Sequence, residues 1–344
     1  MSLVPIRLVE IDDIAVRSLH RESIQRIQQT LEKTLSTASR RRLKERIEKL
    51  ADKRQSGALV LSDRIKPEER TALLHAAKTA RPAKALSSHQ ADEIAADLHQ
   101  KAPWMAAAGT LVMREMRVRT SSGPAAFHAP PMIIEGRPGL GKSWWARAMA
   151  QLVGVQAITL DVGGSGGAVF SLCGSERIWG KSEAGVLVSG MISLRTTNPV
   201  MIIDEVDKAP TNVETAGGKT VPGLIPVLMS MIEPLTAARW HCPYYQVPFD
   251  LRGVSWIMTT NDASRLPQPL LDRCHLVKVP DPTAQQLTMV ARSIAIKRFG
   301  EGVHADAVIG AVEAALERRQ ILSLRSIQRL IERAEAFLAT PPLH

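Results

Sequence analysis

Compact apolar runs recur through the middle of the chain, and stretches with the three- and four-residue spacing of helices separate them. Strands that are buried inside parallel sheets have this uniformly apolar character. The runs lie at residues 132–134, 156–161, 199–204, 254–260 and 275–279. Their alternation with helices predicts an α/β fold built on a parallel five-stranded sheet.

The regions on either side of these runs have helical patterns only. Before the first run, apolar residues recur at helical spacing over 24–35 and 43–50, and again from 88 to 118. After Pro280, three helical segments at 283–298, 304–319 and 323–339 predict an all-helical subdomain. The chain is therefore expected to comprise a helical N-terminal region (1–87), an α/β domain (88–280) and a helical C-terminal subdomain (281–344).

Composition places the chain among ordinary globular proteins. It has 344 residues, of which 45% are hydrophobic and 23% charged. We see no signal peptide and no apolar run of 18 residues, so we expect a cytoplasmic protein that does not span a membrane. Cys173, Cys242 and Cys274 lack metal-site spacing and are expected to be reduced, mostly buried thiols.

The chain is basic, with a net charge of +10. A cluster of arginines at 40–42 lies within the N-terminal helical pattern. Two interpretations remain open: the charge contacts nucleic acid, or it serves solubility and nucleotide binding while the cluster forms a solvated helix face.

The segment Gly136–Ser143 reads GRPGLGKS and fits the pattern G-x-x-x-x-G-K-[ST] between a strand and a helix. Its glycines allow backbone N–H groups to turn toward one anion, and the next helix N-terminus adds partial positive charge. In this setting Lys142 reaches the β- and γ-phosphates, and the Ser143 hydroxyl binds Mg²⁺. The candidate nucleotide-binding residues are Gly136, Arg137, Pro138, Gly139, Leu140, Gly141, Lys142, Ser143 and Trp144.

A second signal is the apolar strand that ends in Asp204-Glu205. In open α/β sheets, ligands bind at the carboxyl ends of strands. Asp204 is suited to hold Mg²⁺ beside Ser143, and Glu205 is suited to polarise the attacking water.

Three further polar residues are candidates for the same site. Asn261, at the end of the fourth run, can orient the water, or it can simply end the strand in a turn. Arg273 and Arg325 carry guanidinium groups that can stabilise charge on a γ-phosphate, although a surface salt bridge is the commoner role of a single arginine.

Taken in order, these motifs resemble those of the AAA+ ATPases. More narrowly, the chain from about residue 88 onward is similar to the ATPase module of the Lon proteases. The narrower match rests on NPVMIIDEVDK (198–208), LMSMIEP (228–234) and VPFDL (247–251).

The resemblance implies a role for each candidate residue. Lys142 and Ser143 belong to the Walker A motif, and Asp204 and Glu205 to Walker B. Asn261 is sensor 1, Arg273 is an arginine finger that acts on a neighbouring subunit, and Arg325 is sensor 2 in a helical lid. It also implies ATP and Mg²⁺ as cofactors and a homo-oligomeric, hexameric ring.

By the same resemblance, Ile178 and Trp179 lie in the first pore loop, where they would grip a protein substrate. Packing of Trp179 at the ring interface is the alternative. Residues 212–221 correspond to a second central loop.

The chain also departs from the Lon pattern. We find no Ser/Lys nucleophile segment of a protease domain, and residues 1–85 do not resemble a Lon-type substrate domain. We therefore expect an AAA+ ring motor that threads or remodels a protein substrate without protease activity of its own. The alternatives are a DNA-associated AAA+ switch or loader and a nucleotide-gated scaffold.

Overall fold

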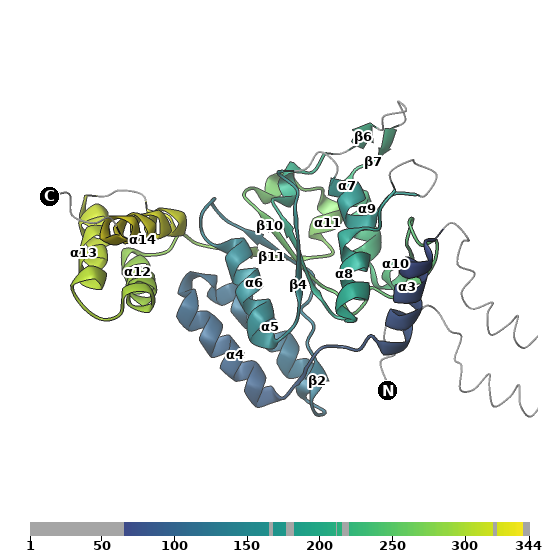
Figure 1. The fold of residues 1–344 in the computed structure, drawn as a ribbon, viewed down its shortest axis with the longest axis horizontal. Coiled ribbons are helices and arrows are strands. Elements are labelled where there is room, and N and C mark those ends of the chain that lie inside the picture. Colours follow the sequence, from purple (N-terminus) through teal and green to yellow (C-terminus); the bar gives the residue numbers. More distant parts are fainter. Residues whose placement is uncertain are drawn as a thin grey trace, which may run out of the picture. The chain divides into compact units, whose positions relative to one another are not determined.

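The computed structural model describes residues 65–164, 168–176, 182–210, 212–214, 220–318 and 322–339. Five strands form one sheet in the order β11–β3–β10–β5–β4 (Figure 1). All neighbouring strands are parallel, which confirms the predicted α/β class and five-stranded sheet. The strands are β3 (Met132–Glu135), β4 (Ala157–Asp161), β5 (Val200–Asp204), β10 (Ser255–Thr260) and β11 (His275–Lys278).

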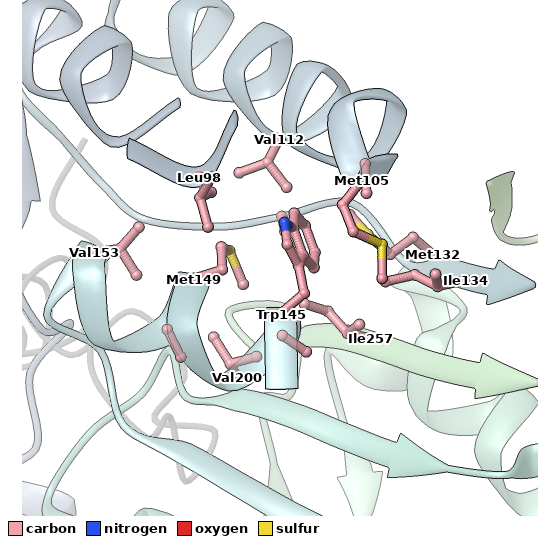
Figure 2. Close-up of a cluster of buried hydrophobic side chains, with 14 of the residues drawn as sticks. Leu98, Met105, Val112, Met132, Ile134, Trp145, Met149, Val153, Val200 and Ile257 are labelled. Atoms are coloured by element: carbon pink, nitrogen blue, oxygen red, sulfur yellow. The ribbon is translucent and has the colours of Figure 1, made fainter. Parts of the chain in front are cut away.

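The main hydrophobic core lies between this sheet and three helices, α4 (Ser88–Lys101), α5 (Ala106–Thr120) and α6 (Lys142–Val153). Figure 2 shows Trp145 at the centre of this cluster, among side chains from the helices and from β3, β5 and β10. Met132, Ile133 and Ile134 of β3 are fully buried, because covering elements pack on both faces of the sheet. The central strands β5 and β10 are buried along their length in the same way, whereas the edge strands β4 and β11 keep exposed residues.

The helical pattern from 88 to 118 does not form one helix. A capping box of Ser87 and Gln90 begins α4, and the helix ends at Ala102, which has φ −146° and ψ 74°. Pro103 then starts the 3-10 turn η1 (Pro103–Met105) before α5 begins. Proline lacks the N–H that a continuing helix needs, and it disfavours helical backbone at the preceding residue.

The C-terminal helices α12 (Ala284–Phe299), α13 (Val303–Glu317) and α14 (Leu324–Ala339) share a core of their own. They match the three predicted helical segments (Figure 1). Thr283 and Gln286 cap the start of α12, and Gly300 ends it with a positive φ of 75°. This subdomain is therefore stabilised by its own packing.

Contacts between residues divide the chain into two compact units. One comprises residues 1–81, 170–197 and 230–252; the other comprises 82–169, 198–229 and 253–344, with the sheet and the C-terminal helices. In the first unit, α3 (Pro67–Thr79) packs against α8 (Val186–Leu194), and β8 (Trp240–His241) pairs with β9 (Pro248–Phe249). The boundaries after residues 87 and 280 stay predictions.

The remaining elements are short. They are β1 (Ala85–Leu86), β2 (Ala125–Ala126), α7 (Ala168–Cys173), η2 (Val206–Lys208), β6 (Asn212–Glu214), β7 (Thr220–Pro222), α9 (Leu224–Ile232), α10 (Pro234–Ala237), η3 (Ala263–Arg265) and α11 (Gln268–Leu271). In the part of the chain that the structure describes, no helix is long and apolar enough to cross a bilayer. The helical patterns before residue 65 and the arginines at 40–42 lie outside the described residues.

Candidate nucleotide-binding and catalytic site

The predicted phosphate loop connects β3 to α6, and its conformation requires glycine at two positions. Gly139 and Gly141 have φ angles of 82° and 78°, which side chains other than glycine rarely adopt. A Cβ atom on Gly139 would lie 3.0 Å from Cβ of Ser323, and one on Gly141 would lie 2.8 Å from Cδ1 of Leu324. Both the backbone angles and the nearby C-terminal subdomain therefore exclude larger residues.

The Lys142 ammonium is enclosed by this loop and by the end of β10. It donates to the carbonyl oxygens of Gly136 and Arg137 at 2.5 and 3.1 Å, and to Oδ1 of Asn261 at 2.9 Å. These bonds use all three ammonium protons. Burial lowers the pKa of Lys142, and nearby carboxylates, Asp204 first among them, oppose this shift. The structure thus brings Lys142 and Asn261 together.

Ser143, in the first turn of α6, also contacts Asp204, the last residue of β5. The Ser143 hydroxyl donates to Oδ1 of Asp204 at 2.6 Å, and the Thr259 hydroxyl donates to the same oxygen. Thr259 is adjacent because its neighbour Met258 pairs with Ile203 in the sheet register. Hydroxyl and carboxylate oxygens are the donors that Mg²⁺ prefers, so these residues fit a Mg²⁺ site.

Glu205 follows directly with a left-handed backbone, φ 56° and ψ 47°. Its N–H donates to Oγ1 of Thr259 at 3.1 Å, and its Oε2 lies 2.5 Å from Nζ of Lys208. The ion pair raises the pKa of Lys208. A Cβ on Gly163 would clash with the Glu205 carboxylate, so the side chain packs closely on that backbone. Lys84, Arg195 and Gln246 also have positive φ and lie outside this group of residues, so the backbone angle is an accompanying feature of the site.

Arg273 lies away from this group of residues. It precedes β11 and donates through Nη1 to the carbonyl oxygen of Pro269 at 2.8 Å. His275 pairs with Met132 at the amino end of β3, whereas the phosphate loop leaves the carboxyl end. The exposed Arg273 side chain is therefore at the opposite edge of the sheet from the phosphate loop of its own chain.

Arg325 belongs to the first turn of α14, which contacts the phosphate loop. The N–H of Leu324 donates to the carbonyl oxygen of Gly139 at 3.3 Å. The Arg325 side chain is exposed and has no ion pair among the described residues.

The other candidates have different positions. The Arg137 guanidinium forms an ion pair with Asp281 at 2.7 Å, where the chain leaves β11 for α12. Trp144 lies in the first turn of α6 and is 45% exposed, whereas its neighbour Trp145 is 1% exposed in the core. The pore-loop candidates Ile178 and Trp179 lie outside the described residues. Within the second predicted loop (212–221), β6 and β7 pair with each other, and residues 215–219 between them lie outside the described residues.

The structure adds two contacts that no sequence motif indicates. The indole N–H of Trp104 donates to the carbonyl oxygen of Leu140, in the phosphate loop, at 3.0 Å. Oε1 of Glu135 accepts the N–H of Ala263 at 3.0 Å, which holds the turn after Asn261.

Comparison with known proteins agrees with this geometry. Residues 132–280 match the family described as "ATPase family associated with various cellular activities (AAA)". The chain is 31% identical over 169 residues to the peroxisomal Lon protease homolog 2 of Arabidopsis thaliana, covering 49% of this chain and 18% of that protein. It is 28% identical over 217 residues to Lon protease 1 of Thermus thermophilus, covering 63% of this chain and 25% of that protein.

These alignments span a quarter or less of the length of the Lon proteases. A similar solved structure is the closed state of Hsp104 with ATPγS and FITC casein, with a TM-score of 0.52 and 14% identity. It covers 78% of this chain and 48% of the Hsp104 chain, and at this identity it shows the fold alone. The chain therefore contains an AAA ATPase domain that is related to the ATPase module of the Lon proteases.

Proposed function

We propose that this protein is an ATP-hydrolysing AAA+ ring motor that remodels or threads a protein substrate. The observation that supports hydrolysis best is the meeting of three motifs at the carboxyl ends of β3, β10 and β5. There Ser143 contacts Asp204, and Lys142 contacts Asn261. These strands are neighbours in the sheet, so one bound nucleotide can contact residues from all three.

Each residue of this group has a role that its chemistry permits. Lys142 exchanges its carbonyl acceptors for phosphate oxygens, and Ser143 and Asp204 hold Mg²⁺. The metal supplies positive charge beside the phosphates. Glu205 accepts a proton from the attacking water, and Asn261 orients that water.

The ring is proposed from the position of Arg273. An arginine at the opposite edge of the sheet is poorly placed for its own nucleotide, but its exposed side chain is accessible to a neighbouring subunit. A guanidinium from the next subunit stabilises the charge of the transferred phosphoryl group. In a closed hexamer every site receives one. Arg325 in α14 is proposed to act within its own chain, because that helix already contacts the loop at Gly139.

A protein substrate is proposed from the Lon relatives and from Hsp104, whose structure contains FITC casein. We place Ile178 and Trp179 in the pore loop that grips it, since Trp offers a large rigid apolar contact. We expect a cytoplasmic motor that releases its substrate uncleaved.

The test uses casein as a model substrate. Casein is expected to stimulate phosphate release by the wild-type ring, and Glu205→Gln is expected to retain casein in ATP but not in ADP. Trp179→Ala should keep the basal ATPase rate and lose the stimulation and the retention. Unchanged casein retention in that variant, with a normal ATPase rate, would contradict threading through this loop.

The same assay separates the alternatives. Stimulation by DNA, declining steeply with salt as counterion release requires, would support the DNA-associated switch instead. Nucleotide binding without measurable phosphate release would support the scaffold.

A further inference from the structure

Trp104 connects the helices before β3 to the phosphate loop. It lies in the 3-10 turn η1, which Pro103 begins between α4 and α5. The side chain is 4% exposed, and its Nε1 lies 3.0 Å from the carbonyl oxygen of Leu140. Trp has a single hydrogen-bond donor, so its polar capacity is fully used by the loop.

This contact is not a general requirement of the core. Trp145 occupies the same hydrophobic cluster, is 1% exposed, and has no partner for its Nε1 among the described residues. The cluster thus contains one indole that serves as apolar filling and one whose N–H is directed at the phosphate loop. The chain itself offers a matched control for the hydrogen bond of Trp104.

The carbonyl that Trp104 holds belongs to a planar trans peptide. In such a unit the C=O of Leu140 and the N–H of Gly141 point in opposite directions. Fixing the carbonyl toward Trp104 therefore directs the Gly141 N–H away from the helices. The adjacent peptide is held in the same way, because the Gly139 carbonyl accepts the N–H of Leu324.

Without these outside partners the two peptides would rotate readily, since each is flanked by glycine. A phosphate loop binds anions through backbone N–H groups that point inward before the anion arrives. If these groups are not held in place, ordering them on binding reduces the affinity. We propose that Trp104 is a positioning residue that fixes the Leu140–Gly141 peptide for phosphate binding. This inference rests on the proposed nucleotide site. It adds that the segment between α4 and α5 sets the orientation of a peptide in the phosphate loop.

The test compares Trp104→Phe with Trp145→Phe in the full-length protein. Both variants lose an indole and keep an aromatic ring in the same core, but only the first loses a hydrogen bond. A net hydrogen bond corresponds to about a fivefold change in affinity. We expect Trp104→Phe to raise the Kd for ATP and ADP, and the KM for ATP, about fivefold. Its kcat at saturating ATP should stay within about twofold of wild type, because no catalytic group is removed.

A second substitution removes packing differences. β-(3-Benzothienyl)alanine at position 104 keeps the bicyclic shape of Trp and replaces the N–H by sulfur. This analogue is expected to weaken the binding of ATP and ADP as much as Trp104→Phe does. If Trp104→Phe fails to fold, the analogue still tests the hydrogen bond. Equal affinities for this analogue and wild type would overturn the proposal, as would an equal loss of affinity in Trp145→Phe. If folded wild type and Trp145→Phe both bind no ATP, the proposed function itself is wrong.

Discussion

The carboxylate of Glu205 and the ammonium of Lys208 form an ion pair, with 2.5 Å between Oε2 and Nζ. Glu205 precedes the 3-10 turn η2 after β5 and Lys208 is its last residue, so the pair is built from local sequence. The ion pair therefore holds the carboxylate of the proposed base against the turn that follows β5.

Lys208→Met is expected to raise the kcat for ATP hydrolysis by up to about fivefold, because it frees the Glu205 carboxylate to contact water and exposed ion pairs are weak. The Kd for ATP should not change. Phosphate release at saturating ATP measures the effect, and Lys208→Arg, which keeps the positive charge, should behave as wild type. A lower kcat in Lys208→Met but not in Lys208→Arg would mean that the pair holds Glu205 in its active position.

Lys142→Ala and Glu205→Gln are expected to separate binding from hydrolysis. Lys142→Ala removes the charge that faces the phosphates and should abolish detectable ATP binding. Glu205→Gln keeps the size of the side chain, so ATP should bind normally while kcat falls about 10²–10⁴-fold. Isothermal titration and phosphate release give the two quantities. Equal turnover in Glu205→Gln and wild type would remove Glu205 as the base.

A bound nucleotide should also stabilise the fold. At 100 times its Kd, ATP with Mg²⁺ is expected to add about 2.7 kcal/mol to the free energy of unfolding. Thermal unfolding with ATP, with and without excess EDTA, measures this gain and the part of it that depends on the metal. Lys142→Ala, which should show no gain, is the control.

Arg273→Ala tests the ring. If the guanidinium acts on a neighbour, this variant should bind ATP normally and hydrolyse it at least about tenfold more slowly. Mixed with Glu205→Gln, it should regain activity, because some sites then combine an intact Glu205 with an intact neighbouring Arg273. The rate of phosphate release across mixing ratios measures this. Purely additive rates would argue against action between subunits.

Much of this arrangement could be predicted from sequence, for identifiable reasons. The central strands β3, β5 and β10 are largely apolar because successive residues in them are buried. Lys142, Ser143, Asp204 and Asn261 were identified because motif order places them at carboxyl strand ends. Thr259 and Trp104 could not be found in this way. Their contacts join residues 55 and 36 positions apart, and in sequence they look like a strand former and a core aromatic residue. The end of α4 before Pro103 was also missed, because the helical spacing of apolar residues takes no account of proline.

The thiols give a pH-dependent prediction. Burial raises the pKa of Cys173 from 9.0 to about 11 and that of Cys274 to about 12. At pH 8 both should react slowly with Ellman's reagent in the native protein and rapidly in urea, because thiolate is the reactive form.

The raised pKa values also affect stability, in one direction. The unfolded chain loses the thiol proton near pH 9 while the folded chain retains it, so the thiols favour folding below pH 9 and lose this effect toward pH 11. Between pH 8 and pH 10, the free energy of unfolding measured by urea titration should fall less for Cys173→Ala than for wild type. Identical falls would contradict the raised pKa of Cys173.

The left-handed backbone of Glu205 has a consequence for which residues can be retained at this position. A residue other than glycine in that conformation costs about 1–2 kcal/mol, and the cost is present whether or not ATP is available. Drift under selection for folding alone would favour glycine or asparagine at this position. If Glu205 is the proposed base, selection for turnover explains why a glutamate is retained here, and we expect replacements in descendants that no longer hydrolyse ATP.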